Sequence, residues 1–372
     1  MQHPETPTPI TPPADGDLAA QARPGYGVPS QDPRPGAQQP LSPAEAEREA
    51  GSAFTAGGVL AGAAAGAAVG AAVGGPVGVV VGGAVGGVAG AVGGAAAGKA
   101  TAGDSVDLHI EDTGGNGRPV VLIHGWPLSA QAWEAQVPLL AAAGYRVVAY
   151  DRRGFGRSAK PASGYGYDQL ADDLAHVLET CGLQQDVTLV GFSMGGGEVA
   201  RYIARHGEAR LRSVVFAAAV PPFMMKGPDN PEGPLTPEKA QEMKQGLEQD
   251  REAFFEQFTR DFFSANGELK VSEQQRADAV ALCRQSDQKA ALACMESFGT
   301  TDFRDDLKKV KVPTLVLHGD ADGIVPVEGS GLRTHRAVPH SKLVTVPGAP
   351  HGLNVSHARE FNDALIAFLR NG

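Results

Sequence analysis

The sequence predicts an α/β fold with a mostly parallel central sheet for residues 101–372, and three observations support this prediction. From Asp104 onward, short apolar runs alternate with amphipathic stretches of helical length, which is typical of strands joined by crossover helices. The apolar runs are almost continuous in Val, Leu and Ile, as expected for strands buried on both faces. Mixed patterns of polar and apolar residues, which a hydrophobic core requires, begin only near Asp104. The core therefore belongs to the C-terminal part of the chain.

The expected elements follow in a regular order. Strands are expected at 106–111, 119–124, 146–151, 187–192, 213–218, 314–318 and 343–346. Helices are expected at 129–142, 168–181, 194–206, 327–338 and 357–370. The segment from about 220 to 310 also has helical patterns and is too long for a simple crossover. We therefore expect a helical cap there, over the end of the sheet where loops carry function.

Five phenylalanines lie in the expected cap, namely Phe254, Phe255, Phe258, Phe262 and Phe263. Two interpretations are open for them. The favoured one places them in the packed interior of the cap, because large apolar side chains are most often core. The other makes them a wall of the substrate pocket.

Residues 1–50 precede this domain and are rich in proline and polar side chains. Such a composition buries too little apolar surface to offset the entropy of ordering the chain, so a disordered arm is expected. The segment lacks the basic start, apolar centre and small-residue cleavage site of a secretory signal. Export by that route is therefore not expected.

Residues 51–100 carry glycine at every fourth position from Gly58 to Gly98, without ionisable side chains up to Gly98. Residues four apart share one face of a helix, so the repeat resembles a glycine zipper, in which helix backbones approach closely. Gly74-Gly75-Pro76 divides the run into two halves. Each half is long enough to cross a hydrocarbon core of about 30 Å.

The favoured interpretation of residues 51–98 is a two-helix hairpin that inserts in a membrane or self-associates. A flexible linker is the alternative, because each glycine costs an isolated helix about 1 kcal/mol relative to alanine. The chain is accordingly expected in the cytoplasm or, through this segment, at a membrane.

Composition also bears on partners and cofactors. The formal net charge is −10 and Lys and Arg form no dense cluster, so nucleic acid is not expected as a partner. Cys181, Cys283 and Cys294 lack the spacing of metal ligands, and their odd number argues against a disulfide framework. We interpret them as small core residues and expect no metal site.

Ser193 is the candidate nucleophile. It lies in Gly191-Phe192-Ser193-Met194-Gly195, a G-x-S-x-G pattern that follows an expected strand and opens an expected helix. Small residues are needed on both sides because the nucleophile occupies a sharp, strained turn. An ordinary capping serine in a glycine-lined turn is the alternative that the remaining motifs disfavour.

A serine hydroxyl needs a base to remove its proton, and His351 is the best-placed histidine for that role. It follows the last expected strand and precedes the C-terminal helix, whereas His124 and His318 each end a strand before glycine and are interpreted as structural. The acid that orients His351 should follow the preceding strand, where Asp320 and Asp322 compete. Asp322 is favoured because it lies farther into the loop, and Asp320 is expected to stabilise the turn. The order Ser, Asp, His then matches this type of site.

Two backbone N–H groups are candidates for stabilising the oxyanion of an acyl-transfer reaction, where each such donor contributes about 10²–10³-fold in rate. The N–H of Met194 directly follows the nucleophile. The second should come from the loop after the first central strand, where Trp126 has an N–H and Pro127 has none. Packing of the Trp126 indole under the cap is the alternative interpretation of this residue, and it does not conflict with a backbone role.

Four motifs together resemble the cofactor-free (non-heme) haloperoxidases, an esterase-perhydrolase family within the α/β-hydrolase superfamily. They are His124-Gly125-Trp126-Pro127-Leu128-Ser129, Asp151-Arg152-Arg153-Gly154-Phe155-Gly156-Arg157-Ser158, the elbow from Gly191 through Tyr202, and Ala349-Pro350-His351-Gly352-Leu353. The resemblance includes the cap stretch Pro221-Pro222-Phe223-Met224 and does not extend to the first hundred residues.

This resemblance implies an α/β-hydrolase fold and a serine esterase that needs no metal or heme. It implies small esters, or carboxylic acids plus hydrogen peroxide, as substrates, with peracids as products that oxidise halide. Pro127 occupies the place of a proline that accompanies better peroxide use in the family.

Several alternatives stay open at this point. Within enzymes they are a lipase, a lactonase or a carbon–carbon hydrolase, whereas a haloalkane dehalogenase would need a carboxylate at Ser193. Outside enzymes, the glycine repeat could be a membrane or assembly scaffold that carries an inert hydrolase as a passenger.

Overall fold

The computed structural model describes residues 106–371, which belong to one compact unit of the chain. The predictions for the arm at residues 1–50 and for the glycine repeat at 51–100 lie outside these residues. Among the helices that the structure describes, none is long and apolar enough to cross a membrane.

A seven-stranded sheet forms the centre of the described unit, in the order β1-β3-β2-β4-β5-β8-β9. The strands are β1 (Ile110–Asp112), β2 (Pro119–Ile123), β3 (Arg146–Tyr150), β4 (Val187–Phe192), β5 (Leu211–Ala217), β8 (Thr314–Gly319) and β9 (Lys342–Val346). Only β1 runs antiparallel to its neighbour. The predicted α/β fold with a mostly parallel sheet is therefore confirmed.

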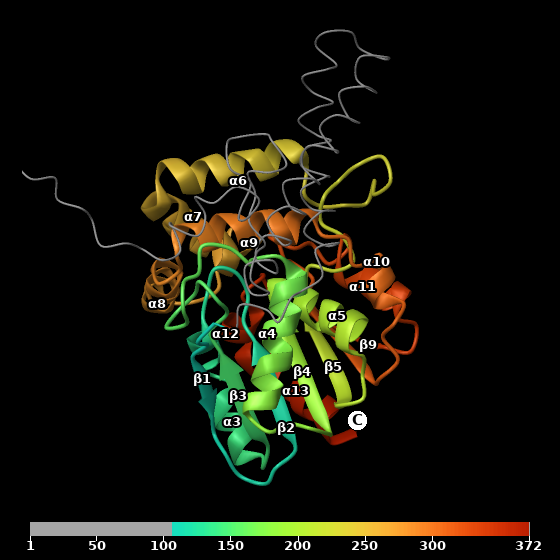
Figure 1. Ribbon diagram of the computed structural model, residues 1–372. Helices are drawn as coiled ribbons and strands as arrows, with labels where there is room; N and C mark the ends of the chain where they lie inside the picture. Colours follow the sequence, from blue (N-terminus) through green and yellow to red (C-terminus); the bar gives the residue numbers. More distant parts are fainter. Residues whose placement is uncertain (1–105, 372) are drawn as a thin grey trace, which may run out of the picture. The chain divides into compact units, whose positions relative to one another are not determined.

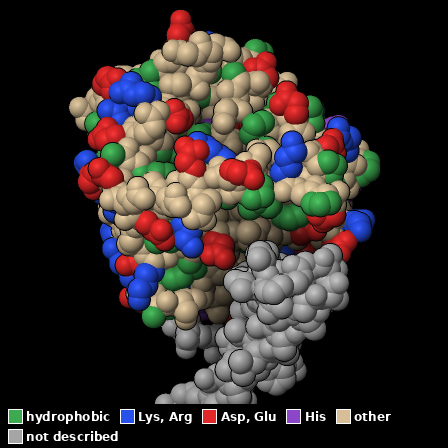
Figure 2. Space-filling model, turned by 90° about the horizontal axis from the view of Figure 1, so that it is seen from above, with side chains coloured by type: hydrophobic (Ala, Val, Ile, Leu, Met, Phe, Trp, Pro, Cys, Tyr) green, Lys and Arg blue, Asp and Glu red, His purple; other side chains and the backbone are tan. Residues whose placement is uncertain are grey.

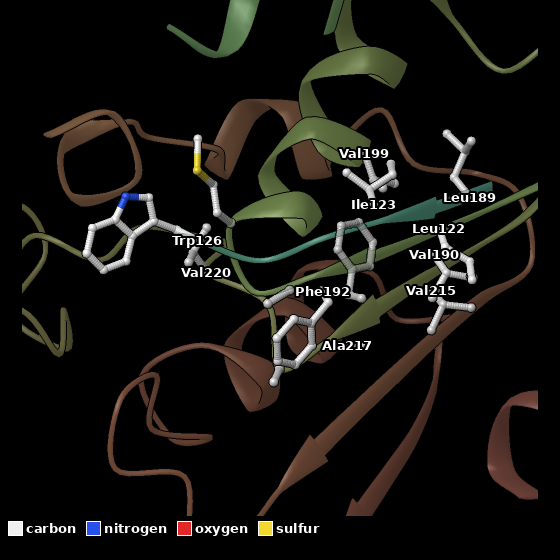
Figure 3. Packing of buried hydrophobic residues seen from close by; sticks show 14 of the residues in the cluster. Leu122, Ile123, Trp126, Leu189, Val190, Phe192, Val199, Val215, Ala217 and Val220 are labelled. Carbon is white, nitrogen blue, oxygen red and sulfur yellow. The ribbon is translucent and has the colours of Figure 1, made fainter. Parts of the chain in front are cut away.

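The interior strands are apolar on both faces because helices cover both. Val190 on β4 pairs with Leu122 on β2 and Val215 on β5, and all three side chains are fully buried. Figure 3 shows these aliphatic side chains packed along the sheet. This continuous burial is the physical reason that the strands appear in the sequence as unbroken apolar runs.

Helices lie on both sides of the sheet (Figure 1). They are η2 (Ala130–Trp133), α3 (Val137–Ala142), α4 (Tyr167–Thr180), α5 (Met194–His206), α11 (Gly331–Ala337), α12 (Leu353–Ser356) and α13 (Ala358–Asn371). In Figure 1, α4 and α5 lie in front of the strands and α13 lies behind them. Trp133 of η2 packs against Phe361 of α13, with ring centroids 6.1 Å apart.

Three expected elements are interrupted or begin more than two residues later in the structure. The helix expected at 129–142 is divided into η2 and α3 around Pro138, which lacks an N–H and whose ring crowds the carbonyl four residues earlier. The helix expected from 327 begins only at Gly331, after a turn in which the N–H of Gly329 donates to Pro326 O. The first strand starts at Ile110, because the N–H of His109 donates to Ser158 Oγ at 2.8 Å instead of to the backbone next to β3.

A helical cap separates β5 from β8. It contains α6 (Pro237–Gln249), α7 (Arg251–Phe263), α8 (Glu273–Arg284), α9 (Gln288–Thr300), α10 (Arg304–Leu307) and a small hairpin of β6 (Ser264–Ala265) and β7 (Glu268–Leu269). The N-caps of the four longer helices are Thr236, Asp250, Ser272 and Asp287, and each of these side chains accepts a backbone N–H of the first turn. In Figure 1, α6, α7 and α9 lie above the carboxyl ends of the parallel strands.

The cap side of the molecule carries charges of both signs. Figure 2 shows Lys and Arg side chains interspersed with Asp and Glu on this face. Several are paired, such as Arg284 with Glu252 and Arg276 with Glu256, each at 2.6 Å. Pairs at the surface contribute little to stability, so the cap is held mainly by its apolar interior.

Candidate active site

Ser193 lies at the junction of β4 and α5, where the chain makes the sharp turn that the sequence predicts. Its backbone is in the left-handed region, with φ of 54° and ψ of −119°, a costly conformation for a residue with a side chain. A Cβ on Gly191 would lie 2.5 Å from Gly195 O, and one on Gly195 would lie 2.5 Å from Ile123 O. Both neighbours must therefore be glycine for the strand, the turn and the helix to approach this closely.

The structure brings Ser193, His351 and Asp322 together in one line. His351 Nε2 is 2.9 Å from Ser193 Oγ, and His351 Nδ1 is 2.7 Å from Asp322 Oδ2. The three come from loops after β4, β9 and β8, whose carboxyl ends open at the same edge of the sheet, the usual position of sites in open α/β sheets. All three residues are buried, Ser193 being 6% exposed.

Asp322 is surrounded by donors. Its Oδ1 accepts the backbone N–H groups of Ile324 at 2.9 Å and Val325 at 2.8 Å. Burial by itself would raise the pKa of this carboxyl, but the charge of His351 and the hydrogen bonds from His318 and His351 lower it below its ordinary value. The group is therefore an anion at neutral pH, as required to orient an imidazole with its proton on Nδ1.

Asp320, the competing acid, lies in a different place. Its Oδ1 accepts the N–H of Gly348 at 2.6 Å, which ties the loop after β8 to the loop that carries His351. A second bond joins these loops, from the N–H of Ala321 to Ala349 O at 3.2 Å. Asp320 thus connects the two loops without a hydrogen bond to His351.

The backbones of Trp126 and Met194 both lie close to Ser193 in the folded chain. A Cβ on Gly125, the residue before Trp126, would be 3.0 Å from the Cβ of Ser193. Met194 is the first residue of α5, whose leading N–H groups have no partner within the helix. Among the described residues, neither N–H group forms a hydrogen bond, so both are available to a ligand.

The Trp126 side chain fixes the same loop to the cap. Its indole Nε1 donates to Ala291 O on α9 at 2.9 Å, and its ring packs edge-on against Phe258 of α7 and Phe298 of α9. Figure 3 shows Trp126 in the loop beyond the end of β2. The indole thus packs under the cap while its backbone N–H stays unpaired.

Four of the five cap phenylalanines, all except Phe254, are buried, which agrees with the favoured interpretation. Phe255 is fully buried, and Phe254 stacks on Phe258 at 6.2 Å inside the cap. Phe262, in contrast, packs edge-on against the His351 ring at 5.0 Å, and its carbonyl accepts the N–H of Gly352 at 2.9 Å. One end of α7 therefore contacts the loop that carries His351.

A buried ion pair behind the elbow is a feature that sequence reasoning missed. Arg152 Nε donates to Glu198 Oε1 at 2.6 Å, and its Nη2 donates to His124 O at 2.6 Å. Glu198 also accepts from Tyr150 at 2.7 Å. Arg152 thereby joins α5 to the loop that contains Trp126. The sequence shows Glu198 as a single charge among small and apolar residues, but it does not show the partner of that charge.

His318 is fully buried and its Nε2 bonds to Val325 O at 2.8 Å, which agrees with the structural interpretation. Its Nε2 also lies 3.2 Å from Asp322 Oδ2, a neighbour that sequence reasoning did not predict. The available signal was the four-residue spacing between a histidine at the end of a strand and a candidate catalytic aspartate.

The cysteines lie apart from this site. Cys283 and Cys294 are fully buried in α8 and α9, and Cys181 is half-buried after α4. Burial raises the pKa of the Cys294 thiol to about 12. Within residues 106–371, no group of three His, Cys, Asp or Glu is arranged to hold a metal ion.

Comparison with known proteins agrees with this geometry. Residues 118–358 match the family model described as the alpha/beta hydrolase fold. A putative non-heme chloroperoxidase of Synechocystis sp. is 44% identical over 268 residues, covering 72% of this chain and 96% of the relative. A bifunctional esterase/perhydrolase of Acinetobacter calcoaceticus is 39% identical over 274 residues, covering 73% and 99%.

Among solved structures, a bromoperoxidase from Bacillus anthracis is 52% identical, covers 71% of this chain and 96% of its own, and has a TM-score of 0.70. The matched family covers more than half of the chain, and the relatives are covered almost completely. The chain therefore belongs to the α/β-hydrolase family, and it is an enzyme of that family with non-heme chloroperoxidase and esterase/perhydrolase relatives.

Proposed function

We propose that this enzyme is a serine esterase that acts on small carboxylic esters through an acyl-enzyme and also accepts hydrogen peroxide as the acyl acceptor. The observation that carries the proposal is the hydrogen-bonded line from Ser193 through His351 to Asp322. Nucleophile, base and orienting acid within hydrogen-bond reach are the requirement for activating a serine hydroxyl.

In the first half of the reaction, His351 Nε2 takes the proton of Ser193 Oγ as Oγ attacks the ester carbonyl. The N–H groups of Trp126 and Met194 donate to the oxyanion that develops on the carbonyl oxygen. The bond to the leaving alkoxide then breaks, and His351 returns the proton to it. The products are the alcohol and an acyl group on Ser193.

In the second half, His351 Nε2 takes a proton from water or from hydrogen peroxide, whose oxygen attacks the acyl carbonyl. The bond between the acyl carbon and Ser193 Oγ breaks, and the proton passes to Oγ. Water gives a carboxylic acid, and hydrogen peroxide gives a peracid. Released peracid would then oxidise halide to hypohalous acid without any metal or heme, which agrees with the names of the relatives.

Other hydrolase activities would use the same three residues, so the substrate class must be determined by comparing activities on different substrates. A lipase, a lactonase and a carbon–carbon hydrolase are distinguished by a panel of p-nitrophenyl esters of increasing chain length, simple lactones and a vinylogous diketone. The proposal expects the highest kcat/KM for short acyl chains, because aromatic side chains of the cap enclose the site, including Phe262 beside His351.

Perhydrolysis is tested with acetate plus hydrogen peroxide, with bromide oxidation as the readout. The expected result is oxidation that requires acetate and disappears in Ser193→Ala, since the peracid must form from the acyl-enzyme. Oxidation that persists without acetate, or in Ser193→Ala, would remove the perhydrolase part of the proposal. Ester hydrolysis measured on the same preparations shows independently whether the esterase part stands.

A scaffold with an inert hydrolase unit is the second candidate from the sequence. Two observations disfavour it. Ser193, His351 and Asp322 form a hydrogen-bonded line, and the backbone at Ser193 is strained, which an inert fold would not need. Residues 51–98, on which the scaffold idea depends, lie outside the described part of the chain.

A further inference from the structure

Two histidines, not one, face the same carboxylate oxygen of Asp322. His351 Nδ1 lies 2.7 Å from Oδ2, and His318 Nε2 lies 3.2 Å from the same atom. The other oxygen, Oδ1, accepts two backbone N–H groups of the following turn. The carboxylate therefore has four donors, and His318 provides the only side-chain donor to it besides His351 among the described residues.

The surroundings of His318 determine which nitrogen carries its proton. Nε2 also lies 2.8 Å from Val325 O, so both neighbours of Nε2 are acceptors and Nε2 must be the donor. Nδ1 is buried and has no hydrogen-bond partner among the described residues. The ring is thus the tautomer with its proton on Nε2, whose N–H bonds to Val325 O and also faces the carboxylate oxygen at 3.2 Å.

The His318 ring is also held sterically. The residue is fully buried at the end of β8. On its other side, a Cβ added to Gly331 would lie 2.6 Å from His318 Nδ1, so the first residue of α11 packs directly on the ring. A ring fixed on both sides is a rigid donor, unlike a water molecule or a flexible side chain.

We propose that His318 is a positioning residue for the reaction: it holds Oδ2 of Asp322 in the direction of His351 and so keeps the imidazole aligned with Ser193. This inference rests on the proposed function, in which Asp322 orients His351. The backbone donors hold Oδ1, and His318 fixes Oδ2, so that the plane of the carboxylate cannot turn away. Outer hydrogen bonds of this kind determine how accurately a catalytic group is placed.

A purely structural role is the competing explanation, because His318 also bonds to Val325 O and could merely anchor the loop. Ser330 offers a matched control. Its Oγ donates to Pro326 O at 2.7 Å in the same loop and has no hydrogen bond to Asp322. Ser330→Ala therefore weakens the loop without changing the donors of the carboxylate.

The experiment compares His318→Leu, His318→Gln and Ser330→Ala by kcat and KM for p-nitrophenyl acetate. Loss of one long hydrogen bond to a charged group is expected to lower kcat by about tenfold in His318→Leu, with KM changed by less than about twofold. His318→Gln keeps an N–H at a similar reach and is expected to recover most of kcat. Ser330→Ala is expected to stay within about twofold of the unaltered enzyme, as typical for a change away from the reacting groups.

The low-field proton resonance of the His351 Nδ1–H provides a second readout, which does not depend on turnover. It is expected to shift or broaden in His318→Leu and to stay in place in Ser330→Ala. If Leu is not accommodated, Gly331→Ala displaces the ring while retaining His318, and it should lower kcat in the same way.

Two results would overturn the inference: a kcat in His318→Leu or Gly331→Ala no lower than in Ser330→Ala, or an unshifted His351 resonance. Failure of the proposed function looks different, because ester hydrolysis by the unaltered enzyme would then be absent or would survive Ser193→Ala. In that case the resonance alone still decides whether His318 positions the carboxylate.

Discussion

Ser193→Ala is expected to lower kcat for p-nitrophenyl acetate by on the order of 10⁵–10⁶, since loss of the nucleophile removes the acyl-enzyme route altogether. The geometry that carries this expectation is the 2.9 Å separation between Ser193 Oγ and His351 Nε2. The oxyanion donors and the binding site remain, so some acceleration over the uncatalysed reaction should persist. Steady-state kinetics on purified full-length enzyme measures the change.

Ser213→Ala is the matched control for this substitution. Ser213 is also a buried serine, but it lies on β5, where its hydroxyl pairs with Thr188 at 2.8 Å and takes no part in the site. The Ser213→Ala enzyme is expected to retain nearly full kcat. A Ser193→Ala enzyme as active as the Ser213→Ala enzyme would exclude Ser193 as the nucleophile.

Asp322→Asn is expected to lower kcat by about 10⁴, although it changes the shape of the side chain very little. The two backbone N–H groups at Oδ1 require an acceptor, so the amide oxygen takes that position and the NH₂ group takes the position of Oδ2. His351 Nδ1 then faces a donor and must give up its proton. The proton moves to Nε2, where it faces Ser193 Oγ and prevents the imidazole from acting as a base.

Asp320→Asn is the natural comparison, because Asp320 and Asp322 lie only two positions apart in the sequence. Asp320 accepts from the N–H of Gly348, and an amide oxygen can accept the same bond. We expect a loss of less than about tenfold, from loosening of the loop that carries His351. The assignment of Asp322 is contradicted if kcat falls equally in both variants, or falls more in Asp320→Asn.

The fold was predictable from the sequence because burial on both faces leaves a strong local pattern. The runs that became β2, β3, β4 and β8 start and end within one residue of the expected bounds. Deviations arose where tertiary contacts compete with local preference. Asp107 and His109, for example, have a strand-like pattern, but the N–H of His109 donates to Ser158 Oγ and Asp107 O accepts from Ala159, so β1 is not extended to them.

The candidate site was predictable in part, because each of its motifs is confined to a few neighbouring residues. Gly191 and Gly195 indicated the strained turn, and the loops after two later strands indicated Asp322 and His351. Their convergence is now given by the geometry, while their catalytic roles stay predictions. Long-range partners leave no comparable signal, because nothing local shows that Arg152 reaches both Glu198 and His124 O.

The most direct test of the central claim is reaction of the full-length enzyme with a fluorophosphonate, followed by peptide mass spectrometry. A serine activated by a neighbouring imidazole attacks the phosphorus and expels fluoride, whereas an ordinary buried hydroxyl does not react. We expect one phosphonylated peptide, with the adduct on Ser193, and no adduct in Ser193→Ala. An unlabelled native enzyme, or labelling at another serine that survives Ser193→Ala, would contradict the account.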